Sequence, residues 1–591
     1  MDEKDNKDEA FRPTLHGTLD KPKWKNAVYI FFVLTILALA ASAIFIFLYF
    51  NDDKESENED DNDNKNDNET VINWYPAGDK IKTIWGKNLD PDKIWQEYPR
   101  PQLERKDWIN LNGLWSYSIR TANDLNPTTH DGNILVPFPI ESSLSGVMKT
   151  FTKDDILWYE KEVEIPKEWE GKNILLNFGA VDWKCEVFIN FKKVGEHTGG
   201  YSYFYFDITK YIKSGKNNIL LRVVDVSDTI YSDWGKYQPV GKQTITPNGI
   251  WYTPSSGIWQ TVWLEPVSKN YINKLEINND FDNQVVKVTF KEANNQSLTI
   301  DFSLMFNNIL VGKAKGKTNE EISIKISDEN FKPWSPEEPN LYTIEAKLSS
   351  NSGDVLDSIT SYTTIRKIES RKDSLGILRI FLNNKPIFNM GPLDQGFWPD
   401  GLYTPPSEEA MVFDIQKLKD LGFNTIRKHV KTEFFRYYYQ CDKIGMLVWQ
   451  DMPSGDTGSG SGSWDPSHMD GGEDTKRTQQ SKDNYYKEWG EIIDNLKFFQ
   501  CIIIWVPFNE GWGQFDTEKV ANFTREKDQT RLINTASGGN HRKGGNIFDL
   551  HHYPEPSQFL TIDDEINVIG EYGGLGLEIK DHQWSKKLGD I

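Results

Sequence analysis

Two glutamates, Glu510 and Glu571, have neighbours that could let them do chemistry together. Each follows a short apolar run that is typical of a buried strand, Ile502–Val506 before Glu510 and Asn567–Gly570 before Glu571. Each also stands beside an aromatic residue and glycines. A carboxylic acid that protonates a leaving oxygen, paired with a carboxylate that attacks an anomeric carbon, can hydrolyse a glycoside. A surface-loop role is the ordinary alternative for one such glutamate, and two at equivalent strand ends weigh against it.

The segment that must position these glutamates, residues 369–591, alternates short apolar strands with helices. The expected strands are Pro386–Met390, Asn424–Lys428, Met446–Trp449, Ile502–Val506, Leu532–Thr535, Ile547–Leu550 and Asn567–Gly570. The expected helices lie near Ser407–Leu421, Thr432–Ile444, Asp483–Phe499 and Asp516–Lys527. Repeated βα units predict a β/α (TIM-type) barrel, with its chemistry at the C-terminal ends of the strands.

The last part of this barrel is short. Glu571 follows the seventh expected strand, and only residues 572–591 come after it. One more helix, an eighth strand and a final helix would need roughly 35–45 residues. We therefore expect a barrel that is truncated before its eighth strand, unless an earlier segment such as Leu375–Leu382 belongs to it.

The chain before the barrel shows all-β patterns. Residues 74–267 contain short alternating runs separated by Gly and Asn turns, which predict a β jelly-roll sandwich. Residues 268–368 add a second set of short strands, of the length of an immunoglobulin-like β-sandwich. Trp183, Trp251 and Trp259 in the first of these domains could stack on sugars, although core packing is the favoured interpretation.

Composition excludes several classes of function. The net charge of −21 over 591 residues argues against nucleic acid, which needs a basic surface. The 3 cysteines are widely spaced and form neither a disulfide framework nor a metal-ligand pattern. His551 next to His552 lacks a third ligand at a familiar spacing, and no nucleotide or dinucleotide motif stands out, so we expect no metal and no cofactor. The oligomeric state is not readable from the sequence.

An apolar run near the start predicts a membrane anchor. Residues 27–50 are almost continuously apolar, long enough for one transmembrane helix, and a buried soluble helix is the alternative. Lysines just before the run place residues 1–26 in the cytoplasm by the positive-inside rule. Residues 51–73 form an acidic linker that cannot bury apolar area. We therefore expect a single-pass type II membrane protein whose body is lumenal or extracellular.

Several longer segments carry a resemblance to a known family. They are YPRPQLERKDWINLNGLW (98–115), GIWYTPSSGIWQTVWLEPV (249–267), PWSPEEPNLY (333–342), NTIRKHVKTEFFRYYYQCDKIGMLVWQDMP (424–453), WVPFNEGWGQFDT (505–517) and VIGEYGGLGL (568–577). From about residue 97 onward the chain resembles glycoside hydrolase family two, the β-galactosidases, β-glucuronidases and β-mannosidases. The resemblance implies a sugar-binding jelly roll, an immunoglobulin-like domain and a catalytic barrel.

The resemblance also implies roles for particular residues. Glu510 corresponds to the acid/base and Glu571 to the nucleophile, while Asn509 corresponds to a residue that bonds the sugar 2-hydroxyl. Arg427 resembles the arginine that keeps the nucleophile ionised, and Tyr553 and His552 lie where the family places groups around it. Further candidates at strand ends, weighed evenly against packing roles, are His429, Asp394, Trp398 and Asp451.

These residues favour an exo-acting retaining β-glycosidase with a carbohydrate substrate. A β-galactosidase is the first expectation, and a β-glucuronidase or β-mannosidase is the alternative within the family. A catalytically dead, membrane-tethered carbohydrate-binding protein is the alternative from another class. The segment after Glu571, where glucuronidases keep their carboxylate-reading residues, is nearly absent, which leaves that substrate untested.

Overall fold

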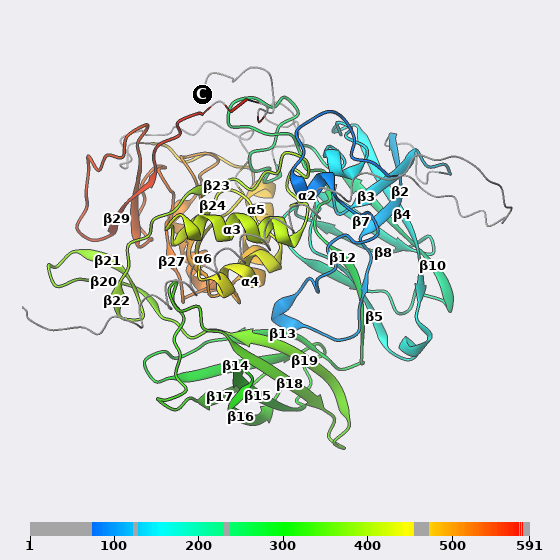
Figure 1. Ribbon diagram of the computed structural model, residues 1–591, viewed down its shortest axis with the longest axis horizontal. Helices are drawn as coiled ribbons and strands as arrows, with labels where there is room; N and C mark the ends of the chain where they lie inside the picture. Colours follow the sequence, from blue (N-terminus) through cyan, green and yellow to red (C-terminus); the bar gives the residue numbers. More distant parts are fainter. Residues whose placement is uncertain are drawn as a thin grey trace, which may run out of the picture. The chain divides into compact units, whose positions relative to one another are not determined.

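The computed structural model describes residues 74–121, 128–227, 237–453, 455, 472–577, 579–580 and 582. Residues from Asn73 onward form one compact unit, and its elements are labelled in Figure 1. The expected cytoplasmic tail (1–26), membrane helix (27–50) and acidic linker (51–73) lie outside the described residues. Within the described ranges, no helix is long and apolar enough to cross a membrane.

The first domain is an antiparallel β-sandwich. Its strands are β1 (Ile109–Asn110), β2 (Gly113–Thr121), β3 (Gly132–Val136), β4 (Asp155–Ile165), β5 (Asn173–Phe178), β6 (Val181–Asp182), β7 (Lys184–Ile189), β8 (Lys192–Thr198), β9 (Phe204–Asp207), β10 (Gly215–Val224), β11 (Gly257–Ile258) and β12 (Val262–Val267). One sheet has the order β1-β12-β5-β9 and the other β3-β2-β4-β10-β7-β8. Alternate residues such as Leu157, Tyr159 and Leu221 face a shared core, which is how two sheets make a sandwich.

The segment before this sandwich differs from the expectation of strands beginning at Trp74. It holds only a short helix, α2 (Ile84–Lys87), and a turn of 3-10 helix, η1 (Pro101–Leu103), before β1. Its apolar residues pack on other domains instead of joining a sheet: Leu103 enters the core of the second domain, and Ile94 and Trp95 pack on the third. Trp95, for example, stacks on Phe434 with ring centroids 4.4 Å apart.

The second domain is a smaller antiparallel sandwich. Its strands are β13 (Ile272–Ile277), β14 (Val285–Glu292), β15 (Thr299–Phe306), β16 (Ile309–Lys317), β17 (Glu321–Lys325), β18 (Tyr342–Ser349) and β19 (Val355–Thr363). They form sheets of order β13-β14-β17 and β16-β15-β18-β19. Every second residue of β14 is buried, which is the pattern of a strand with one face on a core. The expected pair of sandwiches is confirmed.

The third domain is built on parallel strands. An antiparallel unit of β20 (Ile368–Lys372), β21 (Leu378–Leu382) and β22 (Lys385–Pro386) comes first. The parallel strands are β23 (Leu393–Asp394), β24 (Thr425–Lys428), β25 (Leu447–Asp451), β26 (Ile502–Val506), β27 (Leu532–Ile533), β28 (Ile547–His551) and β29 (Ile566–Glu571). Strands β23 to β27 form one sheet in chain order, and β28 pairs with β29. This order is that of a β/α barrel.

The expected first barrel strand, Pro386–Met390, is wrong. Asn383 and Asn384 both have positive φ, and this two-residue turn folds β22 back on β21 as a hairpin. Residues 390–394 then run parallel beside β24, where the Met390, Pro392 and Asp394 carbonyls accept hydrogen bonds, and the first parallel strand is β23. The segment Leu375–Leu382 likewise contains β21, which pairs antiparallel with β20 and is not a barrel strand. In the described part of the chain, no strand follows β29.

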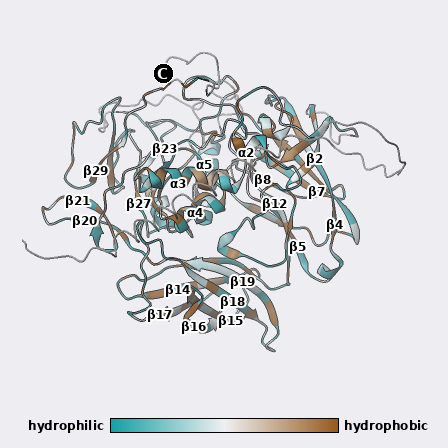
Figure 2. Cartoon of the chain, in the orientation of Figure 1, coloured by the Kyte–Doolittle hydropathy of each residue, from teal (hydrophilic) through white to brown (hydrophobic). Residues whose placement is uncertain are grey.

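In the part of this domain that the structure describes, four helices cover the parallel strands. They are α3 (Glu408–Asp420), α4 (Phe435–Ile444), α5 (Gln479–Leu496) and α6 (Thr517–Lys527). Ser407 caps α3, because its side chain accepts a hydrogen bond from the backbone N–H of Ala410. Gly445, in the left-handed region, ends α4. Helix α3 buries only a few residues, and most of what Figure 2 shows of it is hydrophilic.

Candidate active site

The two glutamates meet at the C-terminal ends of the barrel strands. Glu571 is the last residue of β29, and Glu510 lies in the loop after β26. Glu510 has a φ of 50°, unusual for a residue other than glycine, and its N–H donates to the Ser537 carbonyl over 2.9 Å. One carboxylate oxygen of each glutamate and a ring nitrogen of His551 all lie within 4.8 Å of one another.

Glu571 is buried and surrounded by donors. Arg427 Nη1 donates to its Oε1 over 2.8 Å, and the Tyr553 hydroxyl donates to its Oε2 over 2.6 Å. His551 Nδ1 lies 3.4 Å from the same Oε2. Burial raises the pKa of Glu571, but the charges of His551 and Arg427 more than offset it and lower that pKa to about 2. Glu571 is therefore an oriented carboxylate at neutral pH.

Arg427 is held in place by a buried network. Its Nε and Nη2 bind the two oxygens of Asp451 at 3.1 and 2.9 Å, the bidentate geometry that suits a guanidinium. Nη2 also donates to Asn509 Oδ1 over 2.8 Å. His429 Nδ1 lies 2.9 Å from Asp451 Oδ2. Arg427 and His429 are two residues apart at the end of β24, so both side chains leave the strand on the same face.

Glu510 has a more open surrounding than Glu571. Its side chain is 30% exposed, against 7% for Glu571. His551 Nδ1 lies 2.9 Å from Glu510 Oε1. A carboxylate with one edge open to solvent can exchange a proton with a bound molecule or a water.

His551 links the two carboxylates to the barrel interior. Its Nε2 lies 2.9 Å from Ser537 Oγ, which donates to Asp549 Oδ2 over 2.5 Å. Burial lowers the pKa of His551, but the negative charge of Glu571 and the bond to Glu510 raise it above its usual value. In the protonated form both ring nitrogens donate, one to Glu510 and one to Ser537.

The expected site residues thus divide into two sets. The structure brings together Glu510, Glu571, Asn509, Arg427, His429, Tyr553 and Asp451. The other three expected side chains have different partners. His552 points away from the site, its Nδ1 2.6 Å from the Glu555 carbonyl, because it alternates with His551.

Asp394 and Trp398 are also engaged away from the carboxylates. Asp394 accepts from Lys428 Nζ over 2.6 Å, on the face of β24 opposite to Arg427. Trp398 pairs its backbone with Leu402 and meets the edge of Trp85 at 6.5 Å. Within the ranges that the structure describes, neither side chain bonds to Glu510 or Glu571.

Three functional residues escaped the sequence reasoning. In the sequence, His551 stands out only as a metal-ligand candidate beside His552, and Asp549 and Ser537 do not stand out. The available signal was the alternation of Asp549 and His551 along β28, which puts two polar side chains on one face of a buried strand. Ser537, which follows β27 in a loop, carries no comparable signal.

The donor set Glu510, His551 and Glu571 could in principle hold a metal ion. However, the Glu571 oxygens already accept from Arg427 and Tyr553, and His551 Nδ1 bonds to Glu510. A cation would have to compete with these bonds, so the arrangement fits a metal-free use of the carboxylates better.

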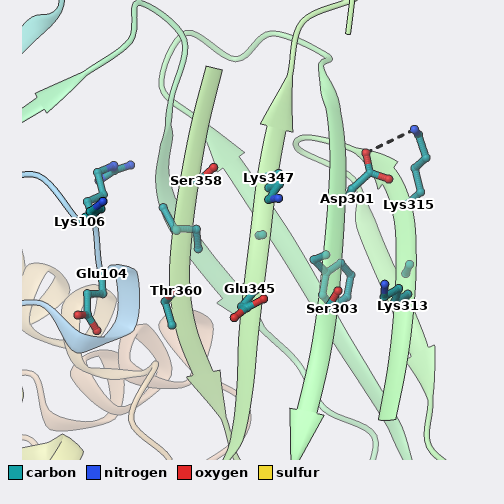
Figure 3. Close-up of a pocket in the computed structure, with 15 residues that line it drawn as sticks. Glu104, Lys106, Asp301, Ser303, Lys313, Lys315, Glu345, Lys347, Ser358 and Thr360 are labelled. Carbon is teal, nitrogen blue, oxygen red and sulfur yellow. Dashed lines mark ion pairs between the residues drawn. The ribbon is translucent and has the colours of Figure 1, made fainter. Parts of the chain in front are cut away.

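A separate hollow of about 870 Å³ lies on the second sandwich. Figure 3 shows it lined by outward-facing side chains of β15, β16, β18 and β19, with Glu104 and Lys106 at one side. Asp301 and Lys315 pair within it at 3.4 Å. This hollow lacks a buried polar group without a partner and is formed by the solvated face of a sheet.

Family models match most of the folded chain. The sugar binding domain of glycosyl hydrolases family 2 matches residues 131–264, a second domain of that family matches residues 270–366, and its TIM barrel domain matches residues 401–549. These three matches follow one another in the order of the three domains described above.

Individual relatives agree with these models. A putative beta-glucuronidase of Formosa agariphila is 26% identical over 73% of this chain and 50% of its own length. A beta-galactosidase of Thermoanaerobacter pseudethanolicus is 27% identical over 72% of this chain and 55% of its own length. The chain thus spans about half the length of these curated relatives.

Solved structures show the same fold at lower identity. The beta-D-glucuronidase of Dictyoglomus thermophilum is 20% identical, with a TM-score of 0.60 over 77% of each chain. The b-glucuronidase of Ruminococcus gnavus is 17% identical, with a TM-score of 0.60 over 78% of this chain and 75% of that one. From the three family models in order and these relatives, the chain belongs to glycosyl hydrolases family 2.

Proposed function

We propose that this chain carries a retaining exo-β-glycosidase in which Glu571 is the nucleophile and Glu510 the acid/base. The observation that carries the proposal is the contrast between two adjacent carboxylates, one buried and ionised and one partly open, with oxygens within 4.8 Å. Carboxyl groups of retaining enzymes lie about 5–5.5 Å apart, and those of inverting enzymes about 6.5–9.5 Å. The short separation supports retention.

In the first step, Glu571 attacks the anomeric carbon while Glu510 gives its proton to the leaving oxygen. Glu571 is pre-oriented for this attack by Arg427 and Tyr553, which hold its two oxygens from different sides. In the second step, Glu510 takes a proton from water as that water displaces Glu571 from the sugar. The open edge of Glu510 gives water a route to the site.

Two neighbours support these roles. Asn509 Oδ1 accepts from Arg427, so the Asn509 amide nitrogen is the group that remains to donate to a sugar hydroxyl. A donor whose bond strengthens in the transition state lowers the barrier. His551 bonds Glu510 and lies close to Glu571, so it can hold both carboxylates through the change of charge.

We propose two main substrate classes, and the family resemblance adds a third. Relatives named beta-galactosidase support a β-galactoside, and relatives named beta-glucuronidase support a β-glucuronide equally well. A β-mannoside remains a third alternative by family resemblance. A membrane-tethered protein that binds carbohydrate without turnover is the competing function, and it is separable from the others by experiment.

The test is a panel of chromogenic β-galactoside, β-glucuronide and β-mannoside substrates offered to the full chain. We expect turnover of at least one, with retention of anomeric configuration seen by proton NMR of the first product. A 2-deoxy-2-fluoro analogue of that substrate should leave a sugar on Glu571, located by peptide mass spectrometry. Binding without turnover of any member would favour the tethered binding protein instead.

We also propose, from the sequence alone, that residues 27–50 anchor the chain in a membrane with the enzyme body on the lumenal or extracellular side. The support is the length of the apolar run and the lysines before it. This placement would give the site access to glycosides outside the cytoplasm.

A further inference from the structure

A loop of the first sandwich reaches the barrel beside the two glutamates. Residues 237–256 contact the segments that follow three barrel strands. Pro239 forms a backbone bridge with Gly455, after β25. Tyr252 stacks on Phe397, after β23, with centroids 4.3 Å apart. This loop, which we name the sandwich loop, therefore lies over the C-terminal ends of the barrel strands, where chemistry occurs.

The sandwich loop also reaches the loop that carries Glu510. Trp251 meets Trp512 edge to face at 5.0 Å, and Trp512 lies two residues after Glu510. Trp251 is thus not a core residue of the first sandwich, contrary to the favoured interpretation. Trp259 is fully buried, but it packs against Tyr403 and Phe434 of the barrel domain. The Trp512 indole N–H is buried and has no partner in the described part of the chain.

One position of the loop, Lys242, is held firmly by its two neighbours. Gln243 donates to Asp182 Oδ2 over 3.0 Å and accepts from the Ser255 N–H over 2.6 Å. Gly241 has a φ of +61°, and a side chain there would meet the Tyr403 hydroxyl at 2.7 Å. The backbone is therefore fixed on both sides of Lys242, and the Lys242 side chain cannot easily point in another direction.

Lys242 is a largely buried lysine whose ammonium pairs with no group in the described part of the chain. The residue is 6% exposed, and its Nζ lies 5.4 Å from the centre of the Trp251 ring. Among the residues that the structure describes, no hydrogen-bond acceptor or carboxylate pairs with this Nζ. Its charge nevertheless acts on Glu571 and Glu510, which places it near both. Burial lowers the pKa of Lys242, and these two carboxylates oppose that shift.

The carboxylates of the site do not need Lys242 as a counter-ion. Glu571 and Asp451 share Arg427, and Glu510 bonds to His551. Enclosing an ammonium that has no hydrogen-bonded protein partner costs part of its solvation, and an anion that enters the site would offset that cost. When no ligand is bound, Trp251 offsets part of this cost, because its ring lies against the ammonium.

We propose that Lys242 binds a negatively charged group, a carboxylate or a sulfate ester, on the glycoside substrate. The proposal rests on the proposed glycosidase function and adds that the sandwich loop selects the substrate. An ammonium also bonds neutral hydroxyls, but only an anion cancels its buried charge. The experiment distinguishes a carboxylate from a sulfate by comparing a substrate that carries each group.

The experiment compares the full chain with Lys242→Gln, Lys242→Arg and the control Lys313→Gln, which removes an exposed charge on β16. The substrates are an aryl β-glucuronide, an aryl β-galactoside and the 6-sulfated form of that galactoside. We expect Lys242→Gln to lower the ratio of kcat/KM for the anionic over the neutral substrate by about 100-fold, as for loss of a buried charge partner. Lys242→Arg should keep most of the ratio, and Lys313→Gln should keep all of it.

A binding measurement separates this proposal from the catalytic one. Thermal unfolding of the Glu510→Gln variant is followed with added glucuronate, galactose or galactose 6-sulfate. We expect an anionic sugar to raise Tm more than galactose does, and Lys242→Gln to abolish that difference, even if no glycoside is turned over. Equal losses on neutral and anionic sugars, or no preference for an anionic sugar in the chain with Lys242 intact, would overturn the proposal.

Discussion

Glu510 and Glu571 are the same residue type in one site, and their different surroundings suit them to different roles. Glu571 stays ionised because Arg427 donates to it, and Arg427 is held in place by two hydrogen bonds to Asp451. Glu510 keeps one exposed edge and one bond to His551. This difference leads to distinct expectations for the two variants.

Replacing Glu571 with Ala should abolish turnover, because no other carboxylate of the described residues is held by Arg427 and Tyr553 in that position. Replacing Glu510 with Ala should lower kcat by roughly 10²–10⁴-fold for substrates with poor leaving groups, which need protonation, and far less for dinitrophenyl glycosides. Steady-state kinetics across a series of aryl leaving groups measures this. Glu555→Ala, an exposed glutamate nearby, is the matched control. Equal losses across the series would count against an acid role for Glu510.

The raised pKa of His551 has a consequence for stability. A group whose pKa is higher in the folded state contributes stability below its unfolded pKa, about 6.5, and loses that contribution as pH rises through the folded value. The difference in unfolding free energy between the unaltered chain and His551→Gln should therefore shrink above pH 6.5. Urea unfolding at several pH values measures it.

Glu571→Gln tests the same interaction from the other residue, because the negative charge of Glu571 is the strongest influence that raises the pKa of His551. In that variant the pKa of His551, followed by NMR of its ring protons, should fall. An unchanged value would mean that Glu571 and His551 are not coupled as the structure has them.

The sequence predicts the site residues that directly follow apolar strands. It misses those that lie in loops or in another domain and join the site only in the folded chain. Glu510, Glu571 and Arg427 stand at recognisable strand ends. Ser537 lies in a loop, and Lys242 comes from another domain. Their place in the site depends on which loops meet in space, and strand patterns alone do not fix that.

At the scale of elements, amphipathic helices and long buried strands were predictable and short strands were not. Strand β26 lies where expected, and α3 begins after its Ser407 cap. The first barrel strand was misplaced because β23 has only two residues, too few for a pattern. Its position depends instead on Gly391, where a Cβ would overlap the Thr425 carbonyl of β24.

This close approach gives a stability prediction. Gly391→Ala should force β23 away from β24 and cost about 2–4 kcal/mol, in the range of severe packing errors. Gly171→Ala is the control, since Gly171 has a φ of +82° but nothing within 4 Å of an added Cβ. It should cost only the 1–2 kcal/mol of a left-handed alanine. Chemical unfolding compares the two, and a Gly391→Ala cost no larger than the control would contradict this close approach.

At the scale of the whole folded unit, the three domains are joined through buried polar bonds. Arg105 binds Glu265 of the first sandwich at 3.0 Å and Asp357 of the second at 2.8 Å. The Trp334 indole donates to the Asp442 carbonyl of α4 over 2.6 Å. With the sandwich loop over the barrel strands, these bonds make the first domain a part of the unit that forms the proposed site. A barrel expressed alone would lack Lys242 and Trp251.

The side of the membrane on which this unit lies is open to a direct test. Lys21, Lys23 and Lys25 precede the apolar run, so the body should be lumenal, where Asn295 of the Asn295-Gln296-Ser297 sequon can receive a glycan. Asn295 is exposed, so folding does not hide it. In sealed microsomes, protease should remove only a small N-terminal piece, and endoglycosidase should lower the mass of the chain by a step that Asn295→Gln abolishes. Digestion of the body in intact vesicles would contradict this orientation, because protease reaches only the cytoplasmic side.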